Sequence, residues 1–153
     1  MNPLFFLAAG VIASLFLASG CAVSTDCGPI RGSVVDAATG KPISQARVTA
    51  EYPTGKTATA RTTDRGDFQL PKHIDYVPLF LNVMLRNGLS KITVEAKGYS
   101  TVVFIRCAAE EGVAIFALYD PQTGAIVDRE HKDALKARLV DNGFDFQPIK
   151  LRQ

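Results

Sequence analysis

The chain has 153 residues, a length that suits a single domain. Its 17 basic and 15 acidic residues give a net charge of +2, and the basic residues form no continuous run. This mild balance gives no electrostatic reason to expect nucleic acid as a partner.

The first 20 residues are predicted to be an export signal. Leu4–Phe16 is almost entirely apolar but too short to span a membrane comfortably. The segment ends in Leu17-Ala18-Ser19-Gly20-Cys21, which resembles the lipobox of bacterial lipoproteins. This resemblance implies cleavage before Cys21 and lipid on that cysteine, and Ala22 after it favours sorting to the outer membrane. An ordinary secretory peptide or an uncut anchor is the alternative.

Two cysteines remain once Cys21 is assigned to lipid. Cys27 and Cys107 are an even pair in an exported chain, and this favours a disulfide between them. The closed loop of about 80 residues would be worth up to about 4–4.5 kcal/mol in the chain-entropy model. Two buried thiols are the alternative.

The first part of the domain reads as short alternating strands closed by turns. Ala22–Gly28 is short and polar and predicts a tether between lipid and domain. Alternating apolar and polar residues then predict four strands. These are Ile30–Val35, Ala46–Tyr52, Thr57–Thr63 and Asp67–Leu70. The third would present a polar face, read either as solvated surface or as a binding face, made of Thr57, Thr59, Arg61 and Thr63.

The next segments are predicted as a loop and a hairpin. Pro71–Pro78 is expected to be irregular, and its His73 and Asp75 are too few for a metal site. Leu79–Ala96 is expected to be a β-hairpin with its two-residue turn at Asn87-Gly88. That register pairs apolar residues on one face, with Val83 opposite Ile92. A helix over Pro78–Asn87 is the alternative.

The last part is predicted to combine two buried strands with a covering extension. Thr101–Cys107 and Val113–Tyr119 are apolar on both faces, so both sides need cover. Ala125–Val127 is expected to pair back on them. A helix over Arg129–Asn142, capped by Asp128, would carry Leu135 and Leu139 on one stripe. We expect this helix and the tail with Phe144 and Phe146 to pack across the outer face of that sheet.

The order of strands and turns resembles the carboxypeptidase regulatory-like domain, a small β-sandwich of transthyretin-like topology. The resemblance covers roughly residues 29 to 105 and implies a mainly β, seven-stranded-type antiparallel sandwich. The matching residues are Gly32, Val34, Asp36, Thr39, Gly40, Pro42, Thr63, Asp64, Gly66, Phe68, Gly98 and Tyr99. It implies little about activity, because such modules are accessories in many proteins.

These expectations divide the chain into four parts. They are a lipoprotein signal peptide (1–20), a short tether (21–28), the β-sandwich (29–127), and a helix and tail packed on it (128–153).

The sequence carries no motif that predicts catalysis. It lacks a Gly-x-Ser-x-Gly elbow, a phosphate-binding loop and a Cys-x-x-Cys pair. It also lacks the Tyr-Arg-Gly-Ser motif of transthyretin-like hydrolases of a urate-derived ring. We therefore expect a non-enzymatic protein without cofactor or metal, anchored through Cys21 in the outer membrane and facing the periplasm. It would bind or scaffold an envelope protein. The alternatives are a carbohydrate- or small-ligand-binding domain and a small transthyretin-like hydrolase.

Overall fold

The computed structural model describes residues 22–78, 89–110, 112–127, 134–140 and 143–153. The predictions for the signal peptide and for lipidation of Cys21 lie outside these residues. No helix within these ranges is long and apolar enough to cross a membrane.

The described residues form strands and no helix, which confirms the prediction of a mainly β chain. The strands are β1 (Ala22–Cys27), β2 (Ile30–Asp36), β3 (Arg47–Glu51), β4 (Thr57–Arg61), β5 (Asp67–Leu70), β6 (His73–Pro78), β7 (Lys91–Glu95), β8 (Val102–Glu110), β9 (Val113–Asp120), β10 (Ala125–Ile126), β11 (Leu135–Val140), β12 (Gly143–Phe146) and β13 (Ile149–Leu151). The four strands predicted before residue 71 are found as β2, β3, β4 and β5, and each boundary lies within two residues of the predicted one.

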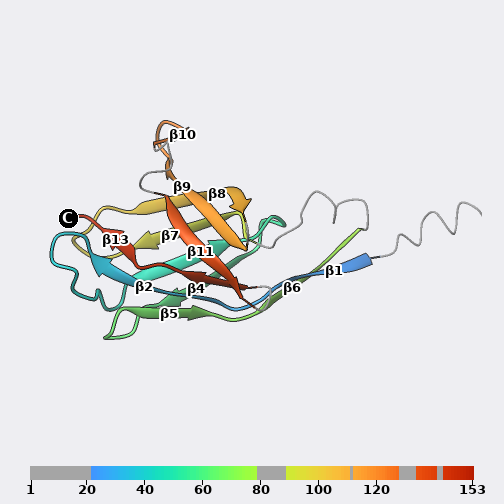
Figure 1. Ribbon diagram of the computed structural model, residues 1–153, viewed down its shortest axis with the longest axis horizontal. Coiled ribbons are helices and arrows are strands. Elements are labelled where there is room, and N and C mark those ends of the chain that lie inside the picture. The colour runs from blue at the N-terminus through green and yellow to red at the C-terminus, as the bar shows by residue number, and fades with distance from the viewer. Residues whose placement is uncertain (1–21, 79–88, 111, 128–133, 141–142) are drawn as a thin grey trace, which may run out of the picture.

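Two sheets hold these strands (Figure 1). One is a ribbon of β1 and β6, and the other has 11 strands in the order β13-β2-β12-β11-β9-β8-β7-β3-β4, with β10 on β9 and β5 on β2. The large sheet curls around one hydrophobic core. Alternate residues of its strands face that core, so each strand has an inner and an outer side.

The predicted hairpin register over Leu79–Ala96 is wrong. Ile92 on β7 lies opposite Ala50 on β3 and opposite Phe104 on β8, so both edges of β7 are occupied. A strand pairing Val83 with Ile92 would find no edge to bond to. Residues 79–88 themselves, including the expected turn, lie outside the described residues.

The predicted helix over Arg129–Asn142 is not found, because Leu135–Val140 forms strand β11 between β9 and β12. Leu135 and Ala137 are buried whereas Lys136 and Arg138 are exposed, which is the period of a strand. A spacing of four between Leu135 and Leu139 fits both a helical stripe and one face of a strand, so this spacing could not distinguish a helix from a strand. Residues 128–133 and 141–142 lie outside the described part.

The tail does not cover the outer face of the sheet; it joins the sheet and fills the core. β12 and β13 both run parallel to β2, with Phe144 opposite Ile30 and Ile149 opposite Val34. The rings of Phe144 and Phe146 lie 5.9 and 5.1 Å from the ring of Phe116. These buried aromatic residues pack β12 against β9 inside the core.

The predicted tether and loop are also strands. Ala22–Cys27 pairs antiparallel with His73–Pro78 over its whole length. Neither segment has strong strand alternation by itself, and each gains its backbone hydrogen bonds from the other.

Candidate functional site

Asp36, the central polar residue of the family motif, organises the turn after β2. Its Oδ1 accepts the N–H of Ala38 at 2.9 Å, the N–H of Thr39 at 2.7 Å and the Thr39 hydroxyl at 3.0 Å. Its Oδ2 accepts the Tyr99 hydroxyl at 3.0 Å. These donors, led by the Thr39 N–H, lower the pKa of the Asp36 carboxyl because they favour its charged form. The carboxylate is thus engaged in holding the fold.

Two motif glycines permit close packing. A Cβ on Gly66 would lie 2.6 Å from the Val34 carbonyl oxygen, and its φ is +78°. A Cβ on Gly32 would lie 2.9 Å from the ring of Phe68, which is itself buried. Among the remaining motif residues, those in the connections between strands are Gly40, Pro42, Thr63, Asp64 and Gly98. The structure therefore places the motif in turns and core contacts.

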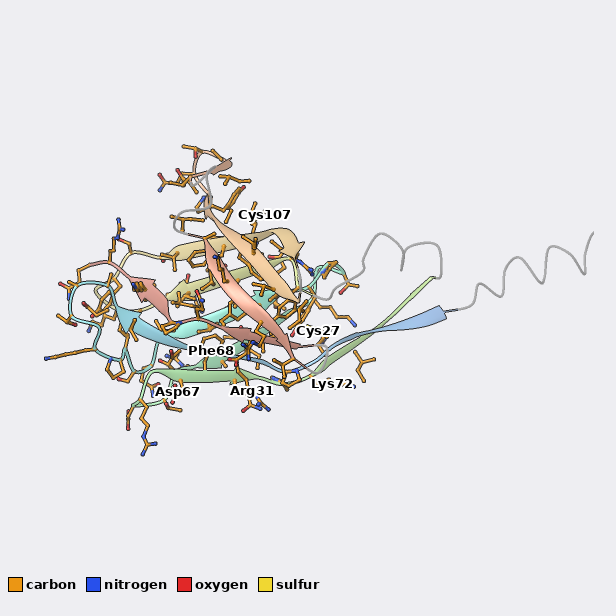
Figure 2. The ribbon with its side chains drawn as sticks, viewed as in Figure 1. Cys27, Arg31, Asp67, Phe68, Lys72 and Cys107 are labelled. Atoms are coloured by element: carbon orange, nitrogen blue, oxygen red, sulfur yellow. The ribbon has the colours of Figure 1, made fainter. Side chains whose placement is uncertain are left out.

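No disulfide joins Cys27 and Cys107 in the described part of the chain, contrary to the prediction. Cys27 is buried at the end of β1, whereas Cys107 is exposed and lies elsewhere on the domain (Figure 2). Cys107 is the extra residue of a bulge between Arg106 and Ala108, and its Sγ donates to the Ile115 carbonyl oxygen at 3.2 Å. An even count of cysteines could not reveal this bulge.

Arg106 precedes the bulge and lies on the same side of β8 as Phe104. Its guanidinium carbon lies 5.7 Å from the centroid of the Phe144 ring, a cation–π arrangement. Burial lowers the pKa of Arg106, and the nearby Cys27 acts in the opposite direction. Arg106 is therefore half-buried beside Phe144, while the next residue, Cys107, is exposed.

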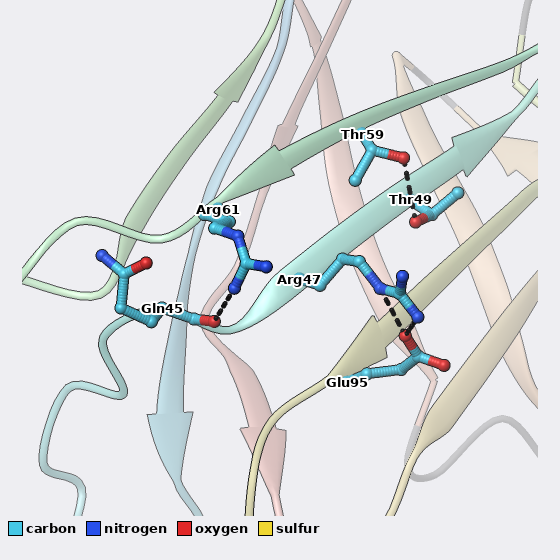
Figure 3. Close-up of polar contacts among 6 residues, drawn as sticks. All are labelled: Gln45, Arg47, Thr49, Thr59, Arg61 and Glu95. Atoms are coloured by element: carbon cyan, nitrogen blue, oxygen red, sulfur yellow. Dashed lines mark hydrogen bonds and ion pairs between the residues drawn. The ribbon is translucent and has the colours of Figure 1, made fainter.

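The outer side of β3, β4 and β7 is polar, and its hydroxyl and charged groups pair with neighbours on the same surface (Figure 3). The Thr49 and Thr59 hydroxyls share a hydrogen bond of 3.2 Å, and Arg61 donates to the Gln45 carbonyl at 3.4 Å. Two ion pairs complete this surface, Arg47 with Glu95 and Lys91 with Glu51. The predicted polar face of Thr57, Thr59, Arg61 and Thr63 is exposed, and these contacts favour its reading as solvated surface.

The outer side of β8, β9 and β11 differs. We call it the outer patch, and its exposed and half-buried residues are Ile105, Val113, Ile115, Lys136, Arg138 and Val140. Val103 and Ala117 lie on the same side but are buried, with exposed fractions of 7% and 0%. Phe104 and Phe116 point to the core, so their neighbours Val103 and Ala117 lie on the opposite side and outside the core cluster. This confirms that β8 and β9 are apolar on both faces.

Exposed cations border the apolar part of the outer patch. Lys136 lies opposite Ile115 and Arg138 lies opposite Val113, so each cation shares a face with its apolar partner. Both cations are exposed, as is Val140 at 42%. The structure records no ion pair of Lys136 or Arg138 with any residue that it describes. Chemically, this surface suits apolar groups flanked by carboxylates.

The sequence did not identify this patch because Lys136 and Arg138 were assigned to a helix. Their alternation with Leu135 and Ala137 was the available signal.

His73, which the sequence analysis considered with Asp75 as a metal ligand, stacks on Tyr52 with ring centroids 4.1 Å apart. Within the described ranges, no three potential metal ligands come together.

Comparison with known proteins bears on part of the chain. The family model of the carboxypeptidase regulatory-like domain matches residues 29–76. No curated protein matches the chain.

Two solved structures are similar at low identity. One is 3-chlorocatechol 1,2-dioxygenase from Rhodococcus opacus 1CP, with 13% identity and a TM-score of 0.39, covering 88% of this chain and 62% of that one. The other is chlorocatechol 1,2-dioxygenase from Pseudomonas putida, with 12% identity and a TM-score of 0.37, covering 83% and 60%. This chain thus spans less than two thirds of either enzyme, and neither similarity bears on what it does. The family match is the informative finding, and it identifies residues 29–76 as a carboxypeptidase regulatory-like domain.

Proposed function

We propose that this chain is a lipid-anchored, non-enzymatic protein of the bacterial cell envelope. Its domain, a β-sandwich of transthyretin-like topology, binds or scaffolds another envelope protein. The observation that supports the binding role best is the outer patch, where half-buried Ile105, Val113 and Ile115 lie beside exposed Lys136 and Arg138.

The anchor rests on the sequence that ends in Cys21. Lipid on this cysteine attaches the chain directly before β1, and Ala22 at the next position favours the outer membrane, with the domain facing the periplasm. The lipid is tested by mass spectrometry of the protein extracted from native membranes. A diacylglyceryl group on Cys21, lost in Cys21→Ser, supports the anchor; an unmodified Cys21 contradicts it.

The outer patch suits a protein better than it suits a sugar. Its half-buried apolar residues come from the adjacent strands β8 and β9, and the cations lie at one border. Protein interfaces combine an apolar centre with a charged rim that selects the partner. The expected partner therefore offers apolar side chains flanked by Asp or Glu.

Site-specific photo-crosslinking in cells tests this role. A photoreactive residue at Val140, on the border of the outer patch, should give one discrete protein adduct. The same residue at Thr59, on the polar outer side of β4, is the matched control and should give none. Charge reversal by Lys136→Glu with Arg138→Glu should abolish the adduct at Val140. Equal adducts at both positions, or an adduct that survives charge reversal, would contradict the proposal.

A further inference from the structure

The ribbon of β1 and β6 continues the pairing of β2 with β5. Cys27 lies opposite His73 at the base of the ribbon, and Ile30 lies opposite Leu70 in the large sheet. Three steps separate Cys27 from Ile30, and three steps separate Leu70 from His73. The register is therefore the same on both sides of the gap, and the four strands form one long antiparallel arm.

By the common register, Pro29 lies opposite Pro71 at the point where the pairing is interrupted. The Pro29 carbonyl accepts the Phe144 N–H of β12, so the backbone polar groups of Pro29 face away from Pro71. The direction and register of the strands are unchanged across this gap.

The base of the arm is held by the domain. The Phe144 N–H donates to the Pro29 carbonyl at 3.1 Å. Gly143 packs so closely that a Cβ there would lie 2.1 Å from the same oxygen. Cys27 is buried, and His73 stacks on Tyr52, which is also buried. These contacts fix the arm where a flexible joint would otherwise form.

We infer that the β1–β6 arm is a stiff spacer that holds the domain at a fixed height above a phospholipid bilayer. This inference rests on the proposed lipidation of Cys21, which adjoins Ala22 at the far end of the arm. Figure 1 shows β1 and β6 running out together from the other strands.

A pair of strands and a flexible linker of the same length span different distances. Six residues in each strand, at about 3.4 Å per residue, give a spacer of about 20 Å. A flexible six-residue linker would average about 13 Å and vary widely. The arm therefore sets both the height and the orientation at which the outer patch meets a partner in the periplasm.

Energy transfer from the domain to the bilayer tests the arm. The lipidated full-length chain is reconstituted in phosphatidylethanolamine and phosphatidylglycerol vesicles, with a donor on the exposed Cys107 and acceptors on lipid headgroups. The variant Ser24→Pro with Thr25→Pro breaks the ladder, because adjacent N–H groups point to opposite sides and one of them must face β6. Ser24→Ala with Thr25→Ala is the matched control and keeps both N–H groups. We expect the proline variant to bring the domain about 7 Å closer and to broaden the distance distribution.

A second variant guards against loss of folding in the first. Inserting Gly-Ser-Gly-Ser between Ala22 and Val23 keeps Val23–Cys27 available to pair with β6 and adds a flexible segment before them, so it should broaden the distribution. Unchanged distances in both variants, or a distribution in the parent as broad as in the variants, would overturn the stiff arm. With Cys21 shown by mass to carry lipid, that result leaves the anchor standing; an unmodified Cys21 overturns both.

Discussion

The outer sides of the two halves of the sheet differ although their inner sides are alike. Both halves turn apolar residues to the same core, such as Val48 and Ile92 in one half and Phe104 and Phe116 in the other. On the outer side, β3, β4 and β7 pair their charges and hydroxyls with one another. In the outer patch, by contrast, apolar residues lie beside cations that are not paired with any described residue. The polar groups of the first surface pair with one another and need no partner, whereas the second surface offers apolar and charged groups that a partner could bind.

The largest effect is expected from deleting residues 135–153. The deletion removes β11, which lies against β9, together with β12 and β13, which lie against β2. Phe116 and Val34 would then face water. We expect the loss of a cooperative thermal transition by circular dichroism, because the core no longer closes. Removing Gln153 alone is the control. A truncated chain that melts cooperatively at the parent temperature would show that the residues before 135 fold without β11, β12 and β13.

A pair of neighbours on β9 separates the two sides of the strand. Phe116 is fully buried against Phe144 and Phe146, so Phe116→Ala should lower the free energy of unfolding by about 3–5 kcal/mol. Ile115 is half-buried on the outer side, and Ile115→Ala should cost about 1 kcal/mol. Denaturant titration measures both. Equal losses would mean that the outer patch is part of a core and is not available to a partner.

Thiol reactivity distinguishes the buried cysteine at the end of β1 from the exposed cysteine at the bulge of β8. Cys107 is exposed, so a maleimide should modify it without unfolding. Cys27 is 3% exposed and should react about a hundredfold more slowly, since it must wait for local opening. Mass spectrometry of the protein, without reductant, gives both rates. Two unreactive cysteines that become reactive together on reduction would restore the predicted disulfide.

The smallest effect is expected on the polar outer side. Arg47 and Glu95 form an exposed ion pair, and breaking it with Arg47→Ala should cost about 0.2–1 kcal/mol, less in high salt. Lys136→Ala in the outer patch should leave stability unchanged, because the structure gives Lys136 no ion pair among the residues described. A double-mutant cycle with Glu95→Ala isolates the pair. A coupling energy between Arg47 and Glu95 above about 2 kcal/mol would show that this pair stabilises the fold more than an exposed ion pair does.

Local chemistry allowed much of the first half to be predicted. The turn after β2 needs a carboxylate that caps backbone N–H groups, and Asp36 supplies it. The turn before β5 needs positive φ at Gly66. Strands bounded by such turns alternate visibly in sequence, so β2 and β5 were predicted nearly to the residue. These features depend on residues a few positions apart, which a single sequence displays.

Only the tertiary structure decided which strands pair and which face is covered. The period of Lys91–Glu95 is the same whether its neighbour is a hairpin strand or β3 and β8 from distant parts of the chain. Leu135 and Leu139, four apart, satisfy a helix and a strand equally, and the open edges of β9 and β2 selected the strand. Likewise, the fold leaves Cys27 buried and Cys107 exposed, so the two cysteines do not meet. Backbone hydrogen bonds must all find partners, and which partner each one finds is settled by the packing of the whole core.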